Sequence, residues 1–221
     1  MTTATEPIIT ILGERVALGL AHRGLEAEAV LINYSDRSAV ELVSGQGLVP
    51  VIDDHGTVVH DSINILRYLD LTRSSNKALF PNDAMKRAAV EIFIEWFDRV
   101  WKVAPNQIAA ELQAENPDHM LIIALGREMR LALDGFEALL SGRKFLMGSE
   151  LSAADCAVFP FVKYALHCDP VDGEPYHRML DDYQELDGDD HMRLRSWIER
   201  IDACRGRERH RVGSRSWTPT W

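Results

Sequence analysis

The stretch that decides the fold is Gly45-Gln46-Gly47-Leu48-Val49-Pro50-Val51-Ile52, in which a proline precedes a β-branched, strand-like run. Proline cannot donate a hydrogen bond to a sheet, so it is tolerated at the start of a strand, often with a cis peptide bond that bends the entering chain. A bend at Val49-Pro50 would leave the backbone N–H and C=O of Val49 unpaired and facing outward. The stretch therefore predicts a strand that starts beside an open binding edge.

Asp61-Ser62 follows eleven residues after Pro50 and opens an amphipathic helix. The free N–H groups and the positive dipole end of a helix suit a carboxylate. Together with the Val49 edge, this helix start predicts a site for a peptide-like, anionic molecule.

Strand and helix patterns alternate on both sides of this stretch, in the order β-α-β…β-β-α, which predicts a mixed sheet with one right-handed crossover. Gly24 is placed to end the first helix. Asp53-Asp54-His55-Gly56 indicates a hairpin between the last two strands. The predicted strands are 8–12, 29–32, 49–52 and 57–60, and the predicted helices are 15–23 and 62–71.

The chain beyond a linker at 71–82 has only helical patterns, so we expect an α/β domain over 1–73 and an all-α helical-bundle domain over 82–221, with a mobile tail from about 205. Pro105 predicts a kink or break in the first long helix. Ser152-Ala153-Ala154-Asp155 forms a capping box, which predicts a structural role for both polar side chains. The predicted helices are 83–115, 120–140, 152–167 and 193–204.

The composition of the chain argues against several classes of binding partner. The formal net charge of −10 argues against nucleic acid and anionic membranes, and no apolar run reaches the about 18 residues of a membrane span. An acidic segment at 181–190 and an arginine-rich tail predict a solvated loop and a mobile terminus. The three cysteines (Cys156, Cys168 and Cys204) favour free thiols in a reducing cytoplasm. No metal-ligand spacing is present, so no metal is expected.

Three motifs in order resemble those of the soluble glutathione S-transferase superfamily over roughly residues 8–204. They are Gly47-Leu48-Val49-Pro50-Val51-Ile52, Asp61-Ser62-Ile63-Asn64-Ile65-Leu66-Arg67-Tyr68-Leu69, and Phe145-Leu146-Met147-Gly148 with Leu151-Ser152-Ala153-Ala154-Asp155. The resemblance implies a thioredoxin-like N-terminal domain and an all-helical C-terminal domain. It also implies a homodimer that uses glutathione, or another low-molecular-weight thiol, as co-substrate.

The resemblance implies roles for four residues in thiol binding. Val49 would pair with the cysteinyl backbone of glutathione and Pro50 would be cis, while Asp61 and Ser62 would hold the γ-glutamyl end. The first long helix of the family lines a pocket for a small hydrophobic substrate. On this helix Phe97 and Trp101 share the core stripe, whereas Trp96 and Arg99 lie off it and are candidates for substrate contact, as is Tyr164 in the later helix; each of these also has an ordinary structural interpretation.

The sequence departs from the family where the thiol should be activated. Family members place a Ser, Tyr or Cys between the first strand and first helix, where its donor stabilises the thiolate. Here only Gly13-Glu14 separates Leu12 from Arg15. Thr10 is the nearest hydroxyl, although it is expected inside the strand, and Arg15 is a candidate source of positive charge.

Two functions therefore remain open. In the first, which the resemblance implies, the chain would be a glutathione transferase-like enzyme that conjugates or otherwise processes a small hydrophobic electrophile with a thiol. Alternatively, it keeps the fold but has lost thiol activation, and it is a thiol-independent isomerase or cyclase, or a non-catalytic binding or regulatory module.

Overall fold

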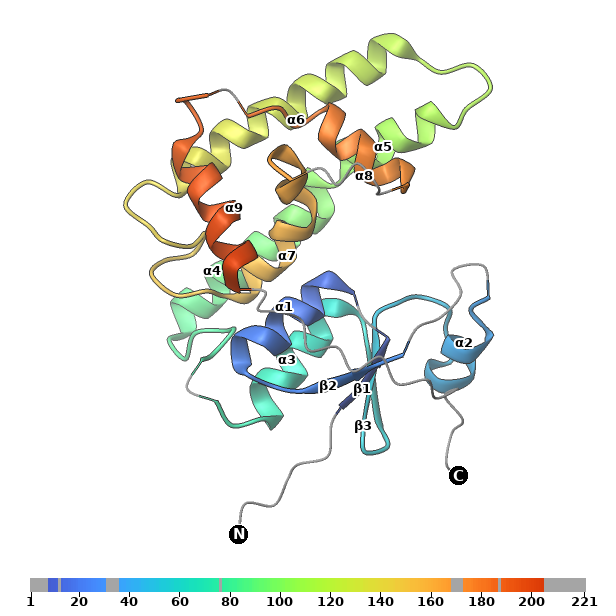
Figure 1. Ribbon diagram of the computed structural model, residues 1–221, viewed down its shortest axis with the longest axis vertical. Helices are drawn as coiled ribbons and strands as arrows, with labels where there is room; N and C mark the ends of the chain where they lie inside the picture. Colours follow the sequence, from blue (N-terminus) through green and yellow to red (C-terminus); the bar gives the residue numbers. More distant parts are fainter. Residues whose placement is uncertain are drawn as a thin grey trace. The chain divides into compact units, whose positions relative to one another are not determined.

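The computed structural model describes residues 8–11, 13–30, 36–75, 77–167, 173–186 and 188–204, with the backbone alone described at 8–11. These residues divide into two compact units, one holding the described residues up to Phe80 together with Cys204 and the other spanning Pro81–Ala203 (Figure 1). The arginine-rich tail, Cys168 and Asp187 of the acidic segment lie outside the described residues.

The first unit is a four-stranded sheet with helices on both faces (Figure 1). The strand order is β2-β1-β3-β4, with β1 and β2 parallel and the other neighbours antiparallel, which confirms the predicted mixed, thioredoxin-like sheet. Its elements are β1 (Ile8–Ile11), α1 (Glu14–Arg23), β2 (Ala27–Ala29), α2 (Ser38–Ser44), β3 (Val51–Asp54), β4 (Thr57–His60) and α3 (Ser62–Thr72).

The alternation of side chains along β3 assigns a core to each face of the sheet. Ile52 packs with residues of α1 and α3, among them Val16 and Leu69. Val51, its neighbour, faces the other way and packs with Val40 of α2. Helix α2 was not expected from the sequence. The second strand was expected at 29–32, of which 31–32 lie outside the described residues; β2 begins two residues earlier, at Ala27, which pairs with Ile8 of β1.

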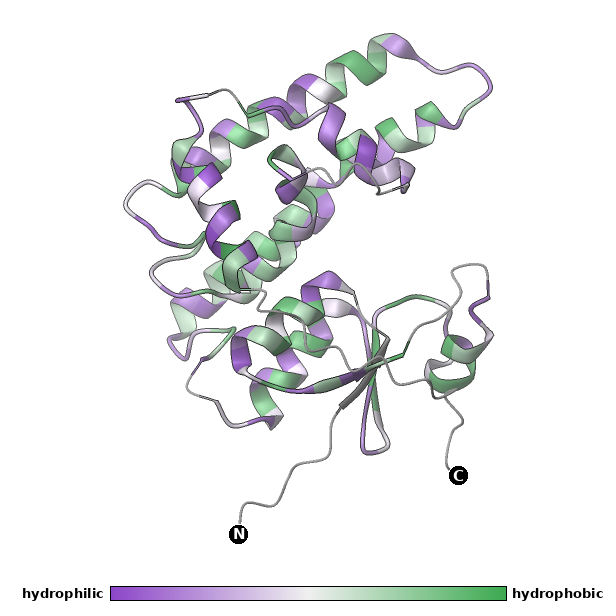
Figure 2. Cartoon of the chain, viewed as in Figure 1, coloured by the Kyte–Doolittle hydropathy of each residue, from purple (hydrophilic) through white to green (hydrophobic). Residues whose placement is uncertain are grey.

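The second unit is helical, as expected. Its elements are α4 (Ala84–Trp96), η1 (Phe97–Trp101), α5 (Val103–Leu112), α6 (His119–Leu139), α7 (Ala153–Val162), η2 (Lys163–Ala165), α8 (Pro175–Asp182) and α9 (Met192–Cys204). α7 is hydrophobic along most of its length (Figure 2) and most of its residues are buried. Helix α8 corrects the prediction of a loop over the whole acidic segment, because Asp181 and Asp182 end this helix.

The first long helix of this unit is interrupted before Pro105, not at it. η1 is a π-helical turn in which the Lys102 N–H donates to the Phe97 carbonyl. Pro105 then falls in the first turn of α5, where an N–H has no intrahelical acceptor. The single helix expected over 83–115 is therefore three consecutive segments. Phe97 and Trp101 are buried and stack with ring centroids 4.6 Å apart, as the core prediction required.

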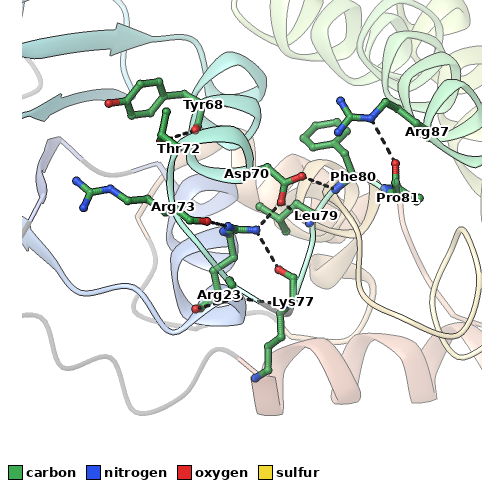
Figure 3. A network of polar contacts seen from close by, with 11 residues as sticks. Arg23, Tyr68, Asp70, Thr72, Arg73, Lys77, Leu79, Phe80, Pro81 and Arg87 are labelled. Carbon is green, nitrogen blue, oxygen red and sulfur yellow. Dashed lines mark hydrogen bonds and ion pairs between the residues drawn. The ribbon is translucent and has the colours of Figure 1, made fainter. Parts of the chain in front are cut away.

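A buried ion pair closes the first unit where α3 leads into the following connection (Figure 3). The Arg23 guanidinium lies 2.5 Å from the Asp70 carboxylate and also donates to the carbonyls of Arg73 and Lys77. Asp70 in turn accepts from the backbone N–H groups of Leu79 and Phe80. These bonds hold the segment that follows α3, residues 73–80, against the C-terminal ends of α1 and α3.

Candidate thiol-binding site

Val49, where the sequence predicts an open backbone edge, lies directly before Pro50 and β3 in the first unit. The Val49-Pro50 peptide bond is cis. The sheet pairings of β3 begin at Val51, so Val49 lies outside the ladder. Its side chain packs with Val40 and Val51 on the inner side. Gly13 lies against the proline ring, since a Cβ at Gly13 would stand 3.3 Å from Cδ of Pro50.

Asp61 and Ser62 form the start of α3. Asp61 is the N-cap, and its carboxylate accepts from the N–H groups of Ile63 and Asn64. Asp61 has φ of 70°, a conformation that non-glycine residues adopt rarely and that concentrates at functional sites. Ser62 is the first helical residue, so its N–H has no intrahelical acceptor by the geometry of an α-helix.

Arg15 reaches this helix start from the first turn of α1. Its Nη1 lies 3.4 Å from the Ser62 hydroxyl oxygen, across 47 residues of sequence. A guanidinium, a hydroxyl and a helix N-terminus therefore converge on one point, and all three favour an anion. Arg15 was expected only as a source of positive charge for the site, and its pairing with Ser62 was not predicted. The pairing arises because α1 and α3 pack side by side, which the sequence alone does not show.

The shortened connection between the first strand and first helix is confirmed. β1 ends at Ile11 and α1 begins at Glu14, with Gly13 as an N-cap that has no side-chain cap. Thr10 lies within β1 and pairs with Ala29 on one side and Ile52 on the other. The orientation of the Thr10 side chain lies outside the description of this strand.

The second unit holds the three candidate substrate-contact residues. Trp96 is 40% exposed and its ring contacts those of Phe93 and Phe136. The Arg99 side chain is exposed and pairs with Glu95 one turn earlier at 2.5 Å. Tyr164 is buried, and its ring stacks on that of His177 at 4.7 Å.

The capping box is structural, as predicted. Asp155 is fully buried and accepts four hydrogen bonds, from the Ser152 N–H and hydroxyl, the Leu146 N–H and the indole of Trp197, each at 2.9 Å. Burial raises the pKa of the Asp155 carboxyl, and the four donors act against that rise. Asp155 therefore ties the start of α7 to the preceding loop and to α9.

Among the described residues, no group of three or more His, Cys, Asp and Glu side chains could hold a metal ion. None of the described helices is long and apolar enough to cross a membrane.

The sequences of both units are similar to those of known proteins. Residues 12–72 match the family model of the glutathione S-transferase N-terminal domain, and residues 123–200 match that of the C-terminal domain. The chain is 25% identical to parA of Nicotiana tabacum, described as a probable glutathione S-transferase, over 69% of this chain and 67% of the relative. It is 33% identical to a probable maleylacetoacetate isomerase 1 of Drosophila melanogaster, over 63% of this chain and 56% of the relative.

Among solved structures, the β-etherase LigF from Sphingobium sp. strain SYK-6 superposes with a TM-score of 0.70 at 19% identity, covering 90% of this chain and 96% of LigF. That likeness shows the fold. The two family models together cover more than half of the chain and coincide with its sheet-containing and helical parts. With both domain models matched in order and the thioredoxin-like and helical units in place, the chain belongs to the soluble glutathione S-transferase superfamily.

Proposed function

We propose that this glutathione S-transferase-like protein binds glutathione, or another low-molecular-weight thiol, and uses it to process a small hydrophobic electrophile. The observation that carries the proposal is the convergence of Arg15 and Ser62 at the start of α3, in the same unit as the Val49 edge. A thiol peptide offers a backbone for that edge and a charged end for that helix start.

The charges of the site match the γ-glutamyl end of glutathione, which is zwitterionic. Its carboxylate would meet the Ser62 N–H and hydroxyl together with the Arg15 guanidinium. Its ammonium would meet the Asp61 carboxylate, which stays acceptor-only while it caps the helix. Val49 would pair with the cysteinyl backbone of glutathione. Pro50, which has no N–H, would end that pairing.

The candidates for activating the sulfur are Thr10 and Arg15. A hydroxyl donor or a nearby cation stabilises a thiolate over a thiol. The Arg15–Ser62 contact supports a role for Arg15 at the carboxylate end of the thiol. Trp96, Arg99 and Tyr164 are proposed to contact the electrophile.

The second candidate function is a transferase fold without thiol activation, acting as a thiol-independent isomerase or cyclase or as a non-catalytic binding or regulatory module. The shortened connection between Ile11 and Glu14 favours it, because this connection would otherwise hold the activating residue. The similarity to a protein named as an isomerase is compatible with this alternative.

The protein is further proposed to be a cytoplasmic homodimer. Several large apolar side chains of α4 and the segments after it are exposed, which supports burial against a second copy. They are Met85, Ile92, Val100 and Val103.

Steady-state conjugation of an aryl halide with glutathione separates the two functions. Under the first, Arg15→Met and Ser62→Ala raise the KM for glutathione about tenfold each, as expected for the loss of a hydrogen bond to a charged group. Arg130→Met removes a guanidinium from an exposed position of α6 and serves as the matched control. Robust conjugation that Thr10→Val abolishes would exclude the alternative. Glutathione binding without conjugation would support it instead.

A further inference from the structure

The loop that precedes Val49 is closed by a side chain to which the sequence analysis gave no role. The Gln46 carboxamide pairs with both backbone groups of Leu48: Nε2 donates to the Leu48 carbonyl at 2.8 Å, and Oε1 accepts from the Leu48 N–H at 2.5 Å. This is the pattern a neighbouring strand would provide, supplied here by one amide group.

The remaining donor of Gln46 is used as well. Nε2 also donates to the Ser44 hydroxyl at 3.0 Å. That hydroxyl lies 2.8 Å from the Val40 carbonyl, within the last turn of α2. Gln46 is half-buried, so its amide is held between the end of α2 and the backbone of Leu48.

The hydrogen bond that holds the Leu48 carbonyl also sets the direction of the Val49 N–H. A peptide group is planar, so the direction of the Leu48 carbonyl determines the direction of the Val49 N–H on the other side of the same bond. The carbonyl is bonded to Gln46, and the N–H it orients belongs to the proposed binding edge. The Leu48 side chain is 78% exposed and contributes little packing of its own. The two hydrogen bonds between the Gln46 carboxamide and the Leu48 backbone, called the Gln46 clamp below, therefore do not depend on packing of the Leu48 side chain.

We propose that Gln46 is a positioning residue for the thiol: by holding both backbone groups of Leu48 it orients the Val49 N–H that the thiol peptide binds. This inference rests on the proposed function, because it names a residue that serves the same site. Gln46 acts through Leu48 and is not proposed to react with the thiol or the electrophile.

Two substitutions separate the parts of the clamp. Gln46→Met keeps the length of the side chain and removes both hydrogen bonds to Leu48. Gln46→Glu keeps the acceptor for the Leu48 N–H but replaces the donor to the Leu48 carbonyl by an oxygen. Gln107→Met, at an exposed position of α5, is the matched control.

The experiment measures calorimetric affinity for glutathione and amide hydrogen exchange at Leu48 and Val49 in the full chain. We expect Gln46→Met to lower the affinity about tenfold, because the misdirected Val49 N–H loses its hydrogen bond to the thiol peptide, and to speed exchange at Leu48. Gln46→Glu weakens binding by a similar factor while the Leu48 amide stays more protected than in Gln46→Met. Gln107→Met changes neither quantity.

Two negative results are distinguishable. If the unsubstituted protein binds glutathione and both Gln46 variants bind it as tightly as the unsubstituted protein does, the positioning role is overturned while the proposed function stands. If the unsubstituted protein does not bind glutathione, both fail. A Gln46→Met protein that does not fold leaves Gln46→Glu to decide between them.

Discussion

At the scale of single residues, a few buried polar groups hold loops and helices in place. Asp155 serves four donors, and removing its carboxylate would leave those donors buried without an acceptor. The cost of such groups exceeds the gain from forming an average hydrogen bond. The residue is therefore structural, although it lies in one of the motifs of the family resemblance.

Replacing Asp155 by alanine is expected to lower the free energy of unfolding by about 4 kcal/mol, because buried donors lose their acceptor. Urea unfolding monitored by tryptophan fluorescence measures it. Ser152→Ala, which removes one of the four donors and keeps the carboxylate, should cost about 1 kcal/mol. Equal costs for the two variants would show that the carboxylate is not the centre of the network.

Glu137 predicts a dependence of stability on pH. Its carboxylate is desolvated, which raises its pKa, but Arg193 and the N–H of Leu194 donate to it and hold the pKa below its ordinary value. A lowered pKa means that the stabilisation is present above the pKa of the unfolded chain and is lost as pH falls through the folded one.

We therefore expect the unsubstituted protein to lose stability below about pH 4.5, as Glu137 takes up its proton. In Glu137→Gln this part of the acid dependence is absent and stability near neutral pH is lower by about 1–3 kcal/mol. Urea midpoints recorded across acid pH values measure both effects. An acid limb identical in the two proteins would show that Glu137 does not contribute to it.

At the scale of elements, the site exists because two helices approach closely. Gly19 of α1 makes room for α3, since a Cβ there would stand 2.2 Å from Cδ2 of Leu66. Leu66 is fully buried and has little space to withdraw. The same packing brings Arg15 of α1 to Ser62 of α3.

Gly19→Ala should therefore destabilise the protein by about 1–3 kcal/mol through overpacking, despite the better helix propensity of alanine. Gly135 of α6 is the matched control, because a Cβ there meets nothing within 4 Å. Gly135→Ala should be stabilising by up to about 1 kcal/mol. Thermal unfolding of both variants measures the contrast, and stabilisation by both would contradict close packing at Gly19.

The same scale shows what the sequence could predict. Strands, hairpin and α3 follow from β-branched runs, turn residues and helical spacing, which are local. Helix α8 has local signals that were overlooked, namely Pro175 at its first position and an apolar face. The π-turn at η1 was missed because it depends on packing that local patterns do not encode. The Arg15–Ser62 contact and the Gln46 clamp were missed for the same reason: the first joins residues distant in sequence, and the second depends on a loop conformation.

At the scale of the whole molecule, the family models and the two units both indicate a transferase fold. The proposed assembly of this fold is a homodimer. Ile92 is 70% exposed on α4. If this face is buried between copies, Ile92→Asp should place an unpaired charge in the interface and shift the protein toward monomer. Sedimentation velocity over a range of concentrations measures this, with Ile123→Asp on α6 as control. A monomeric unsubstituted protein would refute the proposed dimer.

The start of α3 and the Val49 edge are proposed to bind a thiol peptide even though the connection that would hold the activating residue is shortened. Calorimetric titration of the full chain with glutathione tests it most directly, with S-methylglutathione and the Ser62→Ala and Arg15→Met variants alongside. We predict saturable binding at or below millimolar ligand, retained by S-methylglutathione and weakened in both variants. The absence of saturable heat at millimolar glutathione, or equal binding in the variants, would contradict it.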